Sequence, residues 1–176
     1  MIRGVVAAAI LLFIASEARS GDAHRSIQAE VVVEAAVEEV WKAWTTEEGI
    51  RSFFAPAANI DLRPGGRYEI LFSSDSPPGL RGTEGCIVLA VDPERMLSFT
   101  WNSPPSLPEV RPHFTHVTLR FEAIGSTRTR LLFHQDGWGE GGQWDDSLAY
   151  FTRAWKEVVL PRLQKGFAMG AGTGPG

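Results

Sequence analysis

The sequence predicts one α+β domain in which a curved antiparallel sheet of six to seven strands wraps around a long C-terminal helix. Three observations support this fold class. Short segments of alternating apolar and polar residues, separated by Gly- and Pro-containing turns, fill most of residues 58–135. A helical period replaces this alternation over residues 37–54 and predicts two short helices after the first strand. An apolar stripe at helical spacing then covers residues 144–159.

The elements can be assigned in chain order. The β-branched segment 26–34 predicts the first strand. Val40, Trp41 and Trp44 recur at helical spacing within residues 37–46, and a second short helix is expected over residues 47–54, before Pro56. Six further strands are expected at residues 58–62, 67–72, 85–91, 95–102, 114–123 and 127–135.

One face of this sheet is expected to be apolar, because residues of one parity along a strand point to the same side. These residues are Tyr68, Ile70, Phe72, Leu97, Phe99, Trp101, Val117, Leu119, Phe121, Leu131, Phe133 and Gln135. The long helix offers its own stripe to this face: Trp144, Leu148, Phe151, Trp155, Val158 and Val159. Pro161 is expected to kink the last turns, since it cannot donate a hydrogen bond to residue 157.

Composition limits the possible partners. With 17 basic residues against 21 acidic ones, the 176-residue chain has a formal charge of −4, so no nucleic-acid partner is expected. A single cysteine, Cys86, excludes an intramolecular disulfide and a cysteine-rich zinc site, and we expect it to be an inert buried residue. His113 and His116 lie three apart on a strand and face opposite sides, so no metal site is expected.

The two ends are expected to lie outside the domain. Arg3 followed by the uncharged run 4–15 is typical of a signal peptide covering residues 1–23, with cleavage near residues 18–23. A buried first helix or strand is the alternative. The mature protein would then be exported to the periplasm or the extracellular space, with no stable membrane span, because the run is shorter than the ~20 residues a span needs. Residues 24–166 would form the single domain, and the Gly-rich residues 167–176 a disordered tail.

A glycine motif separates the last strand from the long helix. Residues 137–142 match the pattern G-x-G-x-x-G of dinucleotide-binding proteins. That function needs a further parallel strand after the helix, and none is expected here. Asp145 and Asp146 at the start of the helix would also repel a pyrophosphate. We therefore expect no cofactor, and interpret the glycines as a mobile loop that carries Trp138 as a lid.

Four segments of the chain resemble a known family. They read VEEVWKAWTTEEGIRSFF (residues 37–54), LRPGGRYEI (62–70), VLAVDPERMLSFTW (88–101) and GWGEGGQWDDSLAYFTRAW (137–155). In order and spacing the sequence resembles the SRPBCC or START-like helix-grip superfamily, and within it the branch named for the activator of Hsp90 ATPase. This resemblance implies a helix-grip fold with a cavity for apolar or amphipathic small molecules between the sheet and the C-terminal helix.

The chain departs from that family at two points. Many relatives have a histidine two residues before the Gly-Trp pair, whereas this chain has Gln135 there and His134 beside it. The expected signal peptide is also unusual in a mostly cytosolic branch. An exported protein would not meet the Hsp90 ATPase, which argues against a role in activating it.

The aromatic residues predict the site. The chain has six Trp, ten Phe and two Tyr, more rings than a closed core of this size usually needs. Each ring could still be plain core, but together they predict a ligand pocket. The expected ligand-binding residues are Phe54, Tyr68, Phe72, Trp101, Phe114, Gln135, Trp138, Trp144, Leu148, Phe151 and Trp155.

These expectations favour an exported protein that holds an apolar or amphipathic small molecule. Two alternatives remain at this point. The first is an enzyme of the cyclase or dehydratase type, in which one histidine or carboxylate of the same cavity moves a proton. The second is a protein–protein adaptor, which would need a large exposed apolar patch. The sequence assigns no catalytic residue, no particular ligand and no oligomeric state.

Overall fold

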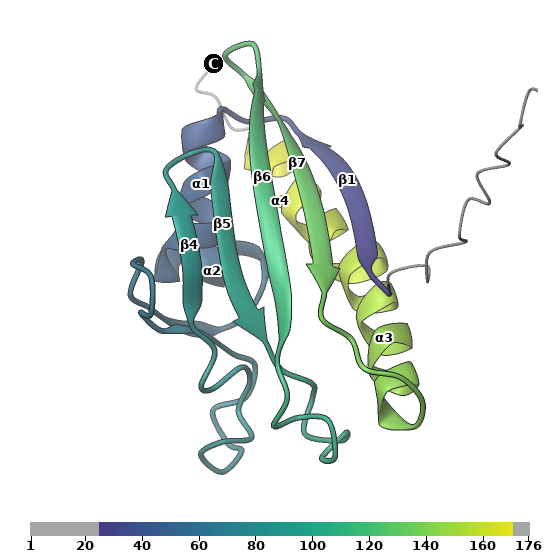
Figure 1. Cartoon of the computed structure of the whole chain (residues 1–176). Helices are drawn as coiled ribbons and strands as arrows, with labels where there is room; N and C mark the ends of the chain where they lie inside the picture. The colour runs from purple at the N-terminus through teal and green to yellow at the C-terminus, as the bar shows by residue number, and fades with distance from the viewer. Residues whose placement is uncertain (1–24, 171–176) are drawn as a thin grey trace, which may run out of the picture.

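The computed structural model describes residues 25–170 (Figure 1). The expected signal peptide and its cleavage site, and the last six residues of the expected tail, lie outside the described residues. The elements, in chain order, are β1 (Ile27–Val33), α1 (Val37–Thr45), α2 (Glu47–Phe53), β2 (Ala57–Ile60), β3 (Tyr68–Leu71), β4 (Val88–Asp92), β5 (Met96–Trp101), β6 (Thr115–Ile124), β7 (Arg128–Asp136), α3 (Gln143–Arg153), the π-helical segment η1 (Ala154–Val159) and α4 (Leu160–Gly170).

The seven strands confirm the expected α+β class and divide into two sheets. Five form an antiparallel sheet in the order β1-β7-β6-β5-β4, and β2 pairs with β3. The β2–β3 pair is linked to the segment that leads into β4 by backbone hydrogen bonds, such as those from the Tyr68 N–H to the Cys86 carbonyl and from the Thr83 N–H to the Ile70 carbonyl. At Gly82 a Cβ would collide with the Ile70 carbonyl. The close approach there needs a residue without a side chain.

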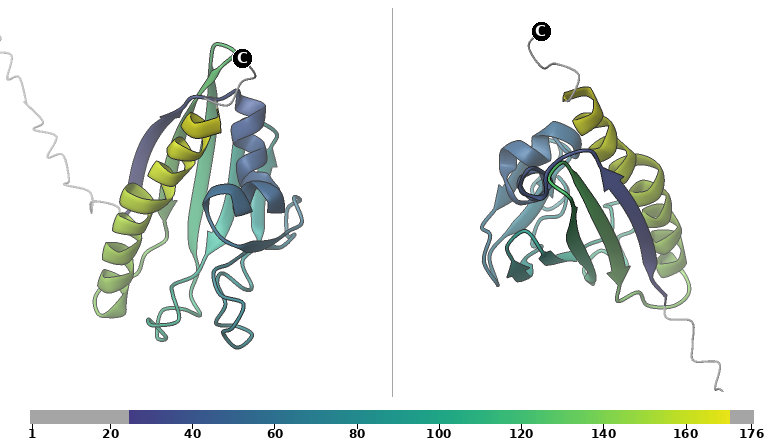
Figure 2. Two further views of the ribbon diagram at one scale, coloured as in Figure 1. Left: turned by 180° about the vertical axis from the view of Figure 1, so that it is seen from behind. Right: turned by 90° about the horizontal axis from the view of Figure 1, so that it is seen from above.

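All the helices cover one face of the five-stranded sheet (Figure 2). The strand residues expected on the apolar face are buried, with one exception: Phe72, just beyond the end of β3, is 48% exposed. The core lies between this face and the helices, and its largest fully buried side chains include Trp44, Tyr68, Phe99 and Trp155. The parity of the strands therefore predicted the buried face correctly.

The two short helices follow β1 as expected. Val40, Trp41 and Trp44 of α1 are buried, in agreement with their helical spacing. The Thr46 hydroxyl caps α2 by accepting a hydrogen bond from the Gly49 N–H at 3.0 Å. The α1–α2 pair places Phe54 at the end of α2, where it faces the C-terminal helix.

The long C-terminal helix is continuous but irregular. It runs as α3, then through η1, where the Leu160 N–H donates to the Trp155 carbonyl five residues back, and then as α4. Pro161, which has no N–H to donate, directly follows this wide turn. Trp155 and Val159 of the expected stripe are buried, whereas Val158 is 40% exposed. The wider π turn changes the helical phase, which the ideal α-helical spacing could not predict.

Helix α4 also changes the expected boundary of the domain. It continues to Gly170, so residues 167–170 are helical and do not belong to the disordered tail that the composition predicts. Phe167 packs against the hydrophobic core. This contact accounts for the longer helix, because burial of a large ring can offset the low helix propensity of nearby glycines.

Candidate functional site

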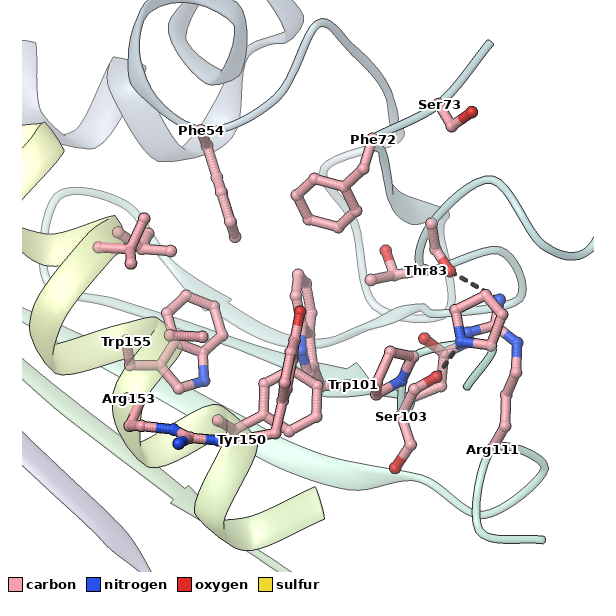
Figure 3. A pocket seen from close by; sticks show the side chains of 18 of the residues that line it. Phe54, Phe72, Ser73, Thr83, Trp101, Ser103, Arg111, Tyr150, Arg153 and Trp155 are labelled. Carbon is pink, nitrogen blue, oxygen red and sulfur yellow. Dashed lines mark hydrogen bonds between the residues drawn. The ribbon is translucent and has the colours of Figure 1, made fainter. Parts of the chain in front are cut away.

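A pocket of about 560 Å³ lies where the C-terminal helix passes the end of β5 (Figure 3). One wall is α3 and η1. The opposite wall is Phe54 and Phe72, and the loops at residues 80–83 and 102–105 complete the lining. In Figure 3, Phe54 and Phe72 point across the pocket toward Trp101, Tyr150 and Trp155. The volume falls within the range of small-molecule sites, roughly 300–1,000 Å³.

Aromatic rings make up the deep part of the pocket. Phe54 stacks on Trp101 with ring centroids 5.9 Å apart and lies 5.5 Å from Trp155. Trp101 and Trp155 are 5.2 Å apart, and Phe72 meets Phe54 edge-on at 5.6 Å. Rings in such contact hold one another in place, so the deep wall is rigid and apolar.

The border of the pocket is apolar and open to water. Among residues 25–170, nine large apolar side chains are exposed, and four of them line this one pocket. We call these four residues the apolar rim: Phe72, Leu80, Tyr150 and Val158. Apolar side chains gathered around a concave site typically mark a binding site.

Two buried polar atoms of the lining have no hydrogen-bond partner among residues 25–170. They are the indole nitrogen of Trp101 and the side-chain oxygen of Asn102. The amide nitrogen of Asn102 is already used, because it donates to the Glu84 carbonyl at 3.2 Å. Both atoms are covered by the surrounding side chains and lie behind the surface of the pocket.

Arg111 ties together the loops that form one side of the pocket. Its guanidinium donates to the carbonyls of Ser103, Gly79 and Gly82, and lies 3.7 Å from a carboxylate oxygen of Glu84. The pKa of the Glu84 carboxyl is lowered: burial opposes this shift, but backbone N–H groups and Arg111 outweigh it. Burial lowers the pKa of Arg111. Arg111 and Glu84 therefore hold together the loops that form this side of the pocket.

Five of the eleven residues expected to bind a ligand line this pocket. They are Phe54, Phe72, Trp101, Phe151 and Trp155. The centre of the interface between sheet and helix is filled by side chains: Tyr68 stacks on Phe99 at 4.1 Å, and Phe133 packs on Trp155 at 4.6 Å. The hollow is therefore at one end of this interface, where the loops meet the helix.

Gln135 and Tyr68 hold the fold and do not line the pocket. The Gln135 amide donates to the Thr115 hydroxyl at 2.8 Å and accepts from the Trp155 indole at 2.7 Å. The Tyr68 hydroxyl donates to the Trp44 carbonyl at 2.8 Å. Both side chains are fully buried, and their polar groups are already paired.

The remaining four expected residues also lie outside the pocket. Trp138 is buried and contacts Trp144 and Phe151, so its ring is part of the core and not the expected lid. Trp144 packs over Gly139, where a Cβ would collide with the indole. Leu148 packs against the core, and Phe114 is 41% exposed, with its ring near Gly85. Ring content alone could not separate these positions from true pocket walls.

The polar and charged part of the lining was not predicted from the sequence. Tyr150, Arg153 and Glu157 border the apolar stripe of the helix at spacings of three and four residues, a signal that could have been used. The loop residues gave no such signal, because their place depends on tertiary contacts. The unpredicted polar and charged lining residues are Ser73, Arg81, Thr83, Asn102, Ser103, Arg111, Tyr150, Arg153, Glu157 and Arg162.

The described residues do not provide the usual features of a metal or dinucleotide site. No group of three or more His, Cys, Asp or Glu in residues 25–170 is arranged to hold a metal ion. After the glycine motif the described chain is helical to Gly170, without the parallel strand that a dinucleotide fold needs. Within the same range, no helix is both long and apolar enough to cross a membrane.

Comparison with protein families gives one match. The family model described as "Activator of Hsp90 ATPase homolog 1-like protein" matches residues 34–167, about three quarters of the chain. The chain belongs to this family. The Activator of Hsp90 ATPase homolog 1-like family has the helix-grip fold, which commonly binds hydrophobic ligands. A comparison with curated proteins finds no match.

Solved structures support the same fold for this family member. Protein MLL2253 from Mesorhizobium loti is similar with a TM-score of 0.65 and 22% identity, covering 82% of this chain and 97% of that one. The Aha1 dimer from Colwellia psychrerythraea gives 0.63 and 17%, with 82% and 97% covered. An Hsp90 activator from Plasmodium falciparum gives 0.62 and 15%, with 82% and 96% covered. At these identities the likeness concerns the fold alone.

Proposed function

We propose that this protein binds an apolar or amphipathic small molecule in the pocket between α3–η1 and the end of β5. The observation that supports it most is the combination of a packed aromatic wall with an exposed apolar rim around one cavity of about 560 Å³. Rings contribute the affinity through burial of apolar surface, and a few polar atoms fix the orientation of the ligand.

A pocket-filling substitution tests this proposal. Ala154 lines the pocket, whereas Ala149 lies on the same helix, is exposed and does not line it. N-phenyl-1-naphthylamine, an uncharged fluorescent probe of apolar sites, should bind the wild-type protein and Ala149→Phe with equal affinity. Ala154→Phe should weaken binding at least tenfold, because the new ring occupies the space of the probe.

The measurement is a fluorescence titration of each purified protein. A circular-dichroism spectrum should show that both variants keep the wild-type fold. Equal binding by Ala154→Phe and the wild type, or no binding by the wild type, would contradict the proposal.

A proton-transfer role would depend on a single carboxylate. Of the titratable lining residues described, four are arginines, one is Tyr150, and one is Glu157 on η1, which carries the carboxylate. Exchange of that carboxylate, Glu157→Gln, would be the matching test for an enzyme of the cyclase or dehydratase type. The aromatic wall and the apolar rim favour binding as the primary function.

We also propose that the protein is exported, which is why a role on the Hsp90 ATPase is not part of its function. Support comes from Arg3 and the uncharged run 4–15. Full-length protein produced in a Gram-negative host should appear in the periplasm. Its mass should be lower by that of the signal peptide, which ends near residues 18–23. The variant Leu12→Arg should stay in the cytoplasm uncleaved. Wild-type protein found only in the cytoplasm at full mass would overturn this proposal.

A further inference from the structure

The pocket has a local charge opposite in sign to that of the whole chain. Its lining contains four arginines, Arg81, Arg111, Arg153 and Arg162, and one acidic residue, Glu157. The complete chain has a formal charge of −4. Basic side chains are therefore concentrated at the pocket of an acidic protein, and such a field attracts anions.

Two of these arginines are already engaged by the loops. Arg111 binds three carbonyls and lies beside Glu84, as described above. The Arg81 side chain donates to the Ser76 carbonyl at 2.9 Å. Both therefore hold the loops around the pocket, and their positive charge remains close to it.

The other two arginines lie on the helix, and their guanidinium groups are free of partners among residues 25–170. Arg153 and Arg162 are exposed and form no ion pair with any residue in 25–170. Arg153 is four residues from Glu157, the usual spacing of a helical ion pair, yet their charged atoms do not come within 4.0 Å. Arg153 also follows Tyr150 of the apolar rim by one helical turn (Figure 3).

The aromatic wall and the free arginines border the same cavity. The apolar part of a ligand can be buried against Phe54, Trp101 and Trp155, while a polar group attached to it remains at the exposed side of the helix. Guanidinium groups bind carboxylates, sulfonates and phosphates with two parallel hydrogen bonds, which a hydroxyl or an amide cannot match.

We propose, on the basis of the function proposed above, that the ligand is an amphipathic organic anion. Its apolar body lies against Phe54, Trp101 and Trp155, and its acid group binds Arg153 or Arg162 on the helix. This orientation places the charge at the water-exposed border, where it need not be desolvated completely.

Two probes with the same aromatic body test the charge preference. The sulfonate 1-anilinonaphthalene-8-sulfonate and the uncharged N-phenyl-1-naphthylamine differ only in the acid group. The wild-type protein should bind the sulfonate about tenfold more tightly at low salt, and the preference should shrink as salt screens the charges.

The variants assign this preference to named residues. The double variant Arg153→Gln/Arg162→Gln should lose the preference by weakening binding of the sulfonate, with binding of the uncharged probe unchanged. Arg128→Gln is the control, because Arg128 is exposed at the start of β7 and does not line the pocket. Ala154→Phe should abolish binding of both probes, which would locate them in this pocket.

The outcomes separate the two proposals. The anion proposal is wrong if Ala154→Phe weakens binding of both probes but the wild type binds them equally. It is also wrong if the double arginine variant keeps the preference for the sulfonate. In both cases the proposed ligand-binding function stands. If neither probe binds in a manner sensitive to Ala154→Phe, the binding function itself is wrong, and the anion proposal fails with it.

Discussion

At the scale of single residues, hydrogen-bond partners distinguish a pocket residue from a core residue. Gln135 and Trp101 are both buried and both close to the pocket. The two ends of the Gln135 amide are paired with Thr115 and Trp155, so this side chain fixes the core. Trp101 lines the cavity, and its buried indole N–H has no partner in residues 25–170. From the sequence alone, Gln135 and Trp101 were equivalent candidates for ligand binding.

Cys86 shows how burial alone determines the chemistry of a reactive group. The residue is fully buried, and burial raises the pKa of its thiol to about 11. In the unfolded chain the thiol titrates near ~8.5. Because the thiolate is the reactive form, we expect native Cys86 to be unreactive at neutral pH. The burial that the sequence predicted for this residue is confirmed.

This difference predicts a loss of stability at alkaline pH. As the pH rises from 8 to 9.5, the unfolded chain loses the thiol proton while the folded protein keeps it, so the free energy of unfolding falls. The expected contribution of Cys86 is about 1 kcal/mol over this window. Urea unfolding at both pH values should show this loss in the wild type.

The variant Cys86→Ala provides the control. Its free energy of unfolding should decrease less between pH 8 and 9.5, by that same ~1 kcal/mol. Tyr68, whose pKa burial also raises, contributes mainly above pH ~10 and is the same in both proteins. Equal slopes for the two proteins would show that Cys86 is not the group responsible.

At the scale of elements, the helices are shaped by what they contact. Helix α2 packs closely behind α1, and a Cβ on Gly49 would collide with the backbone of Lys42 and Ala43. Gly166 in the middle of α4 faces open space. Both glycines lie inside helices, but only Gly49 is required by packing.

These two helical glycines should therefore respond in opposite directions to alanine. Gly49→Ala should destabilise the protein by about 2 kcal/mol, because α1 and α2 must move apart. Gly166→Ala should stabilise it by about 0.5–1 kcal/mol, because alanine favours the helix and nothing obstructs the methyl group. Chemical denaturation of both variants measures the difference, and a change of the same sign in both would contradict the packing described here.

At the scale of the whole molecule, the net charge and the local charge at the site differ in sign. The chain is acidic, yet free arginines lie beside the aromatic pocket. The composition excluded a basic surface for nucleic acid, but it could not show that a few basic side chains gather at one cavity. That arrangement brings together residues 81 and 111 from loops and residues 153 and 162 from the helix.

The sequence by itself determined the order of the elements and the buried face of four strands. It could do so because alternation and helical spacing are local properties, and because burial of an apolar face is the largest driving force for the fold. The family followed from the resemblance of four segments. The aromatic content named eleven candidate residues, of which five, including Phe54 and Trp155, line the pocket.

Only the tertiary structure decided where the interior is filled and where it is hollow. Whether two rings pack together or leave a space depends on distances of a few ångströms between distant segments, which no residue pattern encodes. The π turn before Pro161 and the carbonyls bound by Arg111 likewise depend on contacts made after the chain has folded. The pocket is a product of this packing, whereas the sheet and helix that surround it were already determined by local sequence.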